Sequence, residues 1–146
     1  MKKSLYALLM VSLMMLVGCN KNEEVSLAQS DLVGTWQLES ATMNGEKVDV
    51  SLLGIGEIVF NADGTYTSRV TSLTEGTESG TYEVKNDELH FHATIVYGGQ
   101  TMTNSYVYKI NELTDSKLVI SIDADVPLEN GKTEKISQVM TFKKVK

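Results

Sequence analysis

The sequence predicts an all-β protein, an eight-stranded antiparallel up-and-down β-barrel, on two observations. Short turn signals recur along the chain, and the segments between them alternate between apolar and polar residues. Seven turn signals separate eight strands: Asn44-Gly45, Asp63-Gly64, Glu75-Gly76, Asn86-Asp87, Gly98-Gly99, Asp115-Ser116 and Asn130-Gly131. Several of these dipeptides favour the positive φ of tight hairpins. Eight strands joined by hairpins can close on themselves, which removes exposed sheet edges.

The first element along the chain is an apolar run that is too short to span a bilayer. Lys2 and Lys3 form a basic start, and residues 4–17 are mostly apolar. As a helix at about 1.5 Å per residue, the run reaches about 21 Å, against a hydrocarbon core of about 30 Å. The small residue Gly18 ends it, as in secretory signals. We expect residues 1–18 to be a cleaved signal peptide.

Cys19 follows directly and is the only cysteine in the chain. Leu16-Val17-Gly18-Cys19 resembles the lipobox of bacterial lipoproteins, which implies attachment of a diacylglyceryl group to the Cys19 thiol, with acyl chains such as palmitate, and cleavage before Cys19. Two or three acyl chains hold a protein on a membrane more firmly than one. The alternative is an inert, buried cysteine at the end of an ordinary signal peptide.

The lipoprotein resemblance also implies a location. Asn20 stands where some Gram-negative lipoproteins carry an Asp that retains them in the inner membrane. This implies a lipid-anchored cell-envelope protein of the outer membrane, at its periplasmic face or at the cell surface. With Cys19 acylated, no thiol remains for a disulfide, so the domain must be stable from its core alone.

The segment after Cys19 is polar and without apolar periodicity, so residues 19–31 are expected to be the lipidated cysteine and a flexible tether. Residues 32–146 suit one domain with a modest core. Removal of residues 1–18 leaves 11 basic and 19 acidic residues, a net charge of −8. Such a surface repels phosphate backbones, and no basic cluster interleaved with aromatic residues is present. We therefore expect no nucleic-acid binding.

Strand alternation is clearest between residues 88 and 123. One face of each successive segment holds Leu89, Phe91, Ala93, Ile95 and Tyr97, then Met102, Asn104, Tyr106, Tyr108 and Ile110, then Leu118, Ile120 and Ile122. Antiparallel sheets commonly bury one face and leave the other in water. A two-sheet sandwich is the rival fold, but its crossovers need longer connections than most of these. The one longer gap, residues 48–56, is expected to form a short helical turn or lid at one barrel mouth.

Three short patches resemble a known family. Gly34-Thr35-Trp36 resembles the Gly-x-Trp signature of lipocalins and related barrels, in which the Trp plugs the closed end beneath a basic side chain of the last strand, here Lys143 or Lys144. Together with this motif, residues 60–66, followed by residues 80–82 and 88–91, resemble the lipocalin-like domain of bacterial lipoproteins. The resemblance gives Gly34 and Trp36 a structural role at the barrel base. A sister barrel or sandwich among small envelope lipoproteins also begins with a Gly-Thr-Trp strand.

The chain offers little catalytic chemistry. His90 and His92 share one strand face, but a metal site needs a further ligand, and the chain has no third histidine. We expect both on the solvated outer face, with no metal and no cofactor. The carboxylates cluster at turns, Glu75 and Glu78 among them, and no nucleophile elbow, phosphate-binding glycine loop or HExxH motif occurs. We expect no enzymatic activity.

The barrel interior carries the functional expectation, because eight strands leave a lumen that is either packed or just wide enough for one small ligand. Alternation predicts an inward set of Trp36, Leu38, Ile58, Phe60, Tyr66, Val70, Tyr82, Phe91, Met102, Tyr106, Tyr108, Ile120, Met140 and Phe142, with Ser40, Ser68, Asn104 and Gln138 as polar exceptions. From this set we choose as pocket-lining candidates Tyr66, Met102, Asn104, Tyr106, Tyr108 and Gln138. A filled core remains the other interpretation.

The sequence thus predicts a lipid-anchored envelope lipoprotein whose barrel binds a small hydrophobic or amphipathic ligand without catalysis. The alternative is a protein-interaction module with a filled barrel, such as an inhibitor or an accessory subunit of an envelope complex. Neither interpretation names the ligand or a protein partner.

Overall fold

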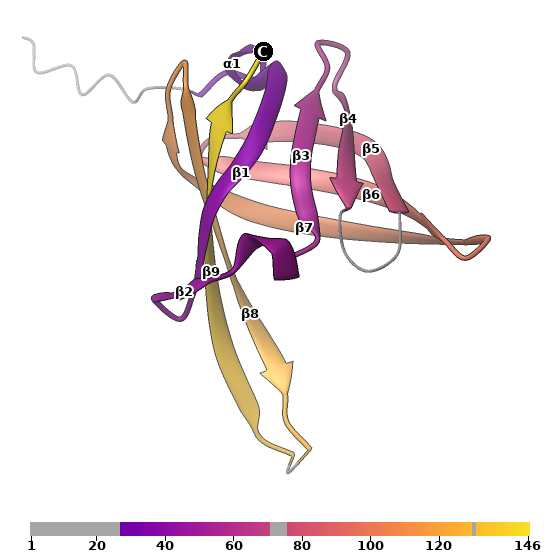
Figure 1. The fold of residues 1–146 in the computed structure, drawn as a ribbon, viewed down its shortest axis with the longest axis vertical. Helices are drawn as coiled ribbons and strands as arrows, with labels where there is room; N and C mark the ends of the chain where they lie inside the picture. Colours follow the sequence, from indigo (N-terminus) through magenta and orange to yellow (C-terminus); the bar gives the residue numbers. More distant parts are fainter. Residues whose placement is uncertain (1–26, 71–75, 130) are drawn as a thin grey trace, which may run out of the picture.

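Eight antiparallel strands close into a barrel in the computed structural model, which describes residues 27–70, 76–129 and 131–146 (Figure 1). The barrel strands are β1 (Gly34–Met43), β3 (Ile55–Phe60), β4 (Thr65–Val70), β5 (Gly76–Lys85), β6 (Glu88–Tyr97), β7 (Gln100–Leu113), β8 (Lys117–Pro127) and β9 (Thr133–Lys144). Each pairs with the next, and β9 pairs back with β1, so the predicted all-β up-and-down barrel is confirmed. The expected signal peptide, Cys19 and the turn residues Glu75 and Asn130 lie outside the described residues.

One predicted strand is divided in two. The turn at Asn44-Gly45 forms, with φ angles of 52° and 84°. The strand that follows it, β2 (Glu46–Val48), is short and pairs only with the end of β1. A 3₁₀ helix, η1 (Val50–Leu52), comes next, and β3 supplies the barrel strand. The sheet of the described residues therefore holds nine strands, and the expected helical turn between residues 48 and 56 is present as η1.

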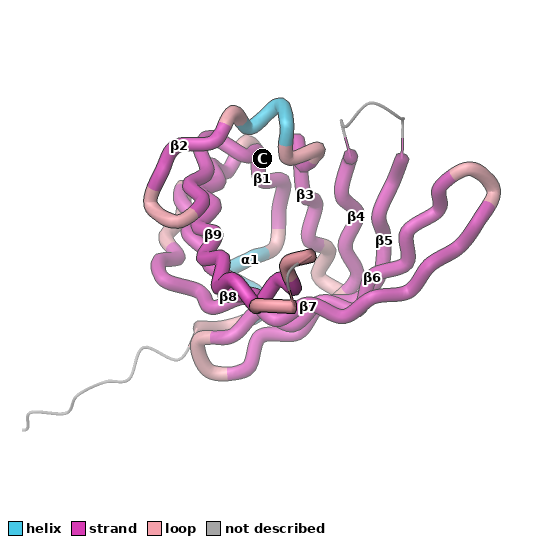
Figure 2. Tube along the Cα trace, turned by 90° about the horizontal axis from the view of Figure 1, so that it is seen from below, coloured by secondary structure: helices cyan, strands magenta, loops and turns pink. Residues whose placement is uncertain are grey.

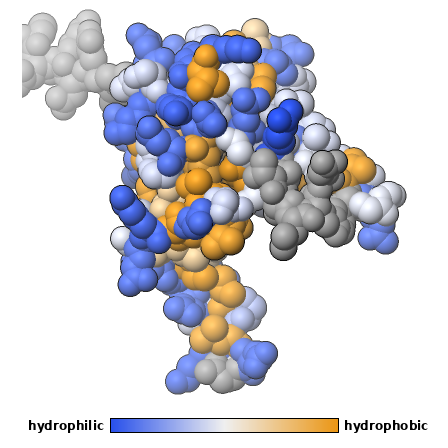
Figure 3. All heavy atoms as spheres, in the orientation of Figure 1, coloured by the Kyte–Doolittle hydropathy of each residue, from blue (hydrophilic) through white to orange (hydrophobic). Residues whose placement is uncertain are grey.

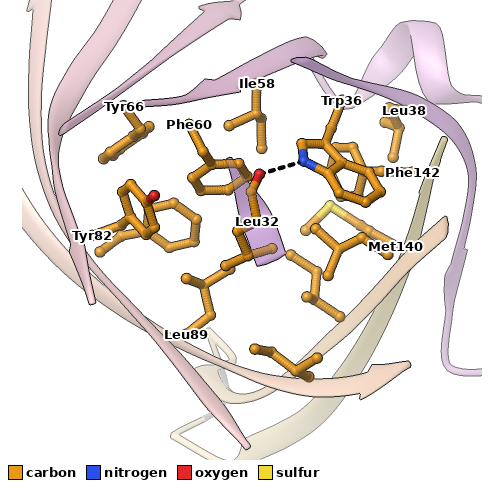
Figure 4. Packing of buried hydrophobic residues seen from close by; sticks show 14 of the residues in the cluster. Leu32, Trp36, Leu38, Ile58, Phe60, Tyr66, Tyr82, Leu89, Met140 and Phe142 are labelled. Atoms are coloured by element: carbon orange, nitrogen blue, oxygen red, sulfur yellow. Dashed lines mark hydrogen bonds between the residues drawn. The ribbon is translucent and has the colours of Figure 1, made fainter. Parts of the chain in front are cut away.

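The folded domain begins before Leu32, within the segment expected to be tether. Helix α1 (Gln29–Leu32) lies at one end of the barrel, and Leu27 packs against the core. Leu32 is fully buried, and its carbonyl oxygen accepts a hydrogen bond from Trp36 Nε1 at 2.7 Å (Figure 4). This bond satisfies the buried indole N–H. In the described part of the chain, no helix has the length and hydropathy needed to cross a lipid bilayer.

Side chains fill the end of the barrel that α1 closes. Figure 4 shows Trp36, Phe60, Leu89 and Phe142 directed toward one another from different strands around Leu32. The rings of Phe60 and Tyr82 meet edge to face with their centroids 4.7 Å apart. The Tyr82 hydroxyl donates a hydrogen bond to the Asn61 carbonyl oxygen at 2.9 Å. This half of the lumen is therefore a packed core.

A bulge changes which residues of β1 face inward. The pairing of β1 with β9 shifts register between Leu38 and Ser40. Before the shift Trp36 and Leu38 are buried, whereas after it Ala41 is buried and Ser40 is only half-buried. A bulge adds one residue to one strand and so reverses the alternation beyond it. The expectation that Ser40 points inward at the same phase as Trp36 is therefore wrong.

The barrel wall has two short seams. Only residues 34–37 of β1 pair with β3, and only residues 109–113 of β7 pair with β8. Beyond the second seam, β7 continues with β6 as one hairpin and β8 continues with β9 as another, and the two hairpins point in different directions (Figures 1 and 2). Register shifts lie next to both seams, in β1, β3 and β7, and such bulges increase strand twist. The barrel is thus tight at the α1 end and splayed at the other.

Candidate functional site

A cavity of about 190 Å³ lies beside the packed core inside the barrel and is partly open to solvent. Seven of the barrel strands contribute to its wall, which is formed by Ile55, Ile58, Tyr66, Ser68, Glu78, Phe91, Tyr106, Tyr108, Ile120 and Met140. Figure 3 shows apolar residues gathered at the centre of one face of the molecule and continuing along the β8–β9 hairpin. The cavity is therefore mainly apolar, with a few polar groups.

Strand register brings these residues together from distant parts of the chain. Ser68 on β4 lies directly opposite Ile58 on β3 and Glu78 on β5. Phe91 on β6 likewise lies opposite Tyr106 on β7. Residues directly opposite each other in a sheet project from the same face. Each of these strands therefore contributes one or two side chains to the same cavity wall.

The polar groups of the cavity centre on Glu78. The Tyr66 hydroxyl donates a hydrogen bond to Glu78 Oε1 at 2.6 Å, the short length typical of a bond to a carboxylate. Burial raises the pKa of Tyr66 above its usual value, and the hydrogen bond to Glu78 raises it further. Burial likewise raises the pKa of Tyr108 to about 12, with a smaller contribution from the charge of Glu78. Both phenols thus keep their protons far above neutral pH.

Aromatic rings form a second feature of the wall. The rings of Tyr66 and Phe91 lie edge to face with centroids 4.8 Å apart, and those of Phe91 and Tyr108 lie 5.9 Å apart at 87°. Such arrangements are the favoured geometries of aromatic pairs. The three rings hold one another in place and give the cavity a defined wall.

The six candidate residues from the sequence divide into two groups. Tyr66, Tyr106 and Tyr108 line the cavity. Met102, with 49% of its surface exposed, and Asn104 lie farther along β7, beyond its pairing with β8, and Asn104 Nδ2 donates to the Tyr106 hydroxyl at 3.2 Å.

Gln138, the sixth candidate, is half-buried on β9, opposite Met43 and Ile122, and is not among the lining residues. Alternation assigns a residue to a face but gives no depth. In the splayed part of a barrel, the inner face therefore no longer borders the cavity.

Two lining residues fall outside the predicted inward set, Ile55 and Glu78. Glu78 was expected among the turn carboxylates, whereas it lies within β5 and faces the cavity. Its position on the strand could have identified it, because residues two apart on a strand share a face, and Glu78 therefore projects from the same face as Gly80 and Tyr82. Ile55 stands at the start of β3 beside a register shift, where alternation is least reliable.

The residues that carry the resemblance at the barrel base lie at the closed end. Trp36 is fully buried, and Lys144 Nζ lies 5.2 Å from its ring centroid, within the range of a cation–π interaction. Gly34 has a φ of +135°, and a Cβ atom there would lie 2.5 Å from the carbonyl oxygen of Lys146. Only glycine fits that position without displacing the backbone of Lys146, which follows the last strand.

The two histidines alternate with buried Leu89 and Phe91 and so project from the outer face of β6. His90 Nε2 lies 3.0 Å from Glu88 Oε2, and His92 Nδ1 lies 3.0 Å from Ser105 Oγ. Among the described residues, no group of three or more His, Cys, Asp or Glu side chains could hold a metal ion.

The chain is similar to known proteins in sequence and in fold. Residues 32–120 match the model of a protein family described as a lipocalin-like domain. A lipocalin-like protein from Bacteroides uniformis is 20% identical in sequence, with a TM-score of 0.50 over 78% of this chain and 98% of that chain. An uncharacterized protein from Bacteroides eggerthii is 21% identical, with a TM-score of 0.48 over 77% and 98%. No curated protein sequence matches the chain. At these identities the first solved structure supports the fold alone.

Proposed function

Because the chain belongs to the lipocalin-like domain family, we propose that its barrel binds one small hydrophobic or amphipathic molecule without catalysis. The cavity of about 190 Å³ is the observation that carries this proposal. An apolar protein cavity of about 150 Å³ holds benzene, so the space suits a ligand built around one ring. The alternative function, a protein-interaction module, was expected to have a filled barrel, and the cavity favours ligand binding over it.

The lining of the cavity supports binding rather than a reaction. A small-molecule pocket typically has apolar and aromatic walls and a few polar groups that orient the ligand. Here Ser68 and Glu78 are the polar groups, with the phenols of Tyr66, Tyr106 and Tyr108. General acid–base catalysis commonly uses paired titratable groups near neutral pKa. Among the described residues that line the cavity, there is one carboxylate and no histidine.

A neutral ring-sized ligand is expected to bind the purified protein. The probe is 2-phenylethanol, and isothermal titration calorimetry and ligand-observed NMR measure its binding. Ser68→Leu should abolish binding, because Ser68 is 6% exposed and a larger side chain there would occupy the cavity. Thr67→Leu adds the same side chain at the neighbouring exposed position and should leave binding unchanged. Equal binding by both variants would contradict the proposed site.

We also propose that the protein is anchored in the outer membrane through acylated Cys19. Support comes from the lipobox-like Leu16-Val17-Gly18-Cys19 and the basic and apolar regions before it. Cells fed radioactive palmitate should label the protein and retain it in the membrane fraction. Cys19→Ala should remove the label, whereas Ser26→Ala should keep it. A mature protein free in solution with an unmodified Cys19 thiol would overturn this part of the proposal.

A further inference from the structure

Among the described residues that line the cavity, Glu78 is the one carboxylate, and none of the others is basic. The lining residues of the described chain include no Lys, Arg or His. Within the described residues, Glu78 forms no ion pair, and its hydrogen bond is the one that it accepts from Tyr66. Oε1 accepts that bond, so Oε2 receives no hydrogen bond from the described protein. A charge held in a partly dry site is costly unless a partner compensates it.

The charge of Glu78 acts across the cavity. It contributes to raising the pKa of both Tyr66 and Tyr108, which stand on different strands, after the larger effect of burial. The cavity therefore has a negative potential at the tyrosine hydroxyls. An anionic ligand such as a fatty acid would place its carboxylate near Glu78 and be repelled. The net charge of the whole chain, −6, has the same sign and attracts cations to the molecule.

The aromatic rings of the cavity wall also favour a positively charged ligand. Tyr66, Phe91 and Tyr108 are three of the lining residues, and edge-to-face contacts fix their rings relative to one another. The face of an aromatic ring attracts a cation, and the attraction grows where water is excluded. A carboxylate oriented by a phenol and flanked by aromatic rings has the features of a site for an ammonium group.

Resting on the binding function above, we propose that the ligand is a small organic cation, a protonated amine that carries one ring-sized apolar group. Its ammonium group donates a hydrogen bond to Glu78 Oε2 and contacts the tyrosine rings. Its apolar group lies against Ile58, Ile120 and Met140, three of the four aliphatic residues in the wall. Glu78 therefore selects the ligand by charge, and the rest of the cavity selects it by size.

Three probes of similar shape and different charge test this proposal on the purified protein by isothermal titration calorimetry. They are 2-phenylethylammonium, neutral 2-phenylethanol and anionic 3-phenylpropanoate. The ammonium probe should bind at least about tenfold more tightly than the alcohol, and the anion should bind most weakly. Glu78→Gln keeps the shape of the side chain but removes its charge, and it should weaken binding of the ammonium probe about tenfold, roughly 1.4 kcal/mol, with the alcohol unaffected.

The matched control is Glu83→Gln on the same strand. Glu83 is exposed and lies 2.8 Å from Lys85 Nζ, so its substitution should change the affinity for none of the probes. If the alcohol and the ammonium probe bind equally, the charge selection is overturned while the binding function stands. If none of the three binds, both fail. Thermal unfolding shows whether Glu78→Gln is folded, and if it is not, the ranking of the three probes on the unaltered protein decides.

Discussion

Replacement of Trp36 by alanine is expected to lower the free energy of unfolding by about 3–5 kcal/mol, the usual cost of truncating a buried aromatic residue. Trp36 is fully buried at the closed end, and its indole holds α1 through the hydrogen bond to Leu32. The variant loses both the packing and that bond. Domains are stable by only about 5–15 kcal/mol in total, so this change removes a large share.

Urea titration followed by far-UV circular dichroism measures this loss, because Trp36 is the only tryptophan and its fluorescence disappears with it. Trp36→Phe keeps most of the apolar volume but not the hydrogen bond to Leu32, and we expect an intermediate loss. Leu52→Ala is the control, since Leu52 is 77% exposed and its truncation should change stability by less than about 0.5 kcal/mol. A loss below about 1 kcal/mol for Trp36→Ala would show that Trp36 does not hold the barrel base.

Gly80→Ala is expected to cost about 3 kcal/mol of stability, because the new methyl group has no space. Gly80 on β5 lies opposite Ala93 on β6, and a Cβ atom at Gly80 would overlap the carbonyl oxygen of His92 and approach Ala93 Cα to 3.2 Å. Backbone atoms within a ladder cannot rotate away as a flexible side chain can. The two strands must therefore separate locally.

The same titration tests this prediction, and hydrogen exchange of the β5 and β6 amides locates the change. Ser79→Ala is the matched control, because Ser79 is the next residue on β5 and is exposed. Its stability should remain within about 0.5 kcal/mol of the unaltered protein. If Gly80→Ala is as stable as Ser79→Ala, the close approach of β5 and β6 at this point is wrong.

The closed barrel could be predicted because its signals are local. The dipeptide Asn44-Gly45 favours a tight turn through its own backbone preferences, and strand alternation needs only neighbouring residues. Which residues of β1 face inward could not be predicted beyond Leu38, because the bulge that moves Ala41 inward depends on the pairing with β9. The exposure of Met102 escaped prediction for a similar reason, since it depends on where β7 parts from β8.

The cavity was predicted in its aromatic part and missed in its charged part. Tyr66, Tyr106 and Tyr108 fit the expectation of an inward face that carries apolar and amphipathic residues. Glu78 contradicts that expectation, because hydrophobic patterning places carboxylates outside and turns accommodate them readily. An acid at an inward position of a strand is the kind of local inconsistency that functional sites show.

The two seams divide the barrel into unequal shells that meet at the cavity. Strands β3 to β7 form one shell and supply eight of its ten lining residues, and β8 and β9 of the other shell supply Ile120 and Met140. Few ladder hydrogen bonds cross either seam, so small hinge motions there require less free energy than motions within a shell. Such motions would change the distance between Ile120 and Glu78 and with it the volume of the cavity. The volume of the cavity thus depends on backbone pairing at the two seams as well as on the side chains that line it.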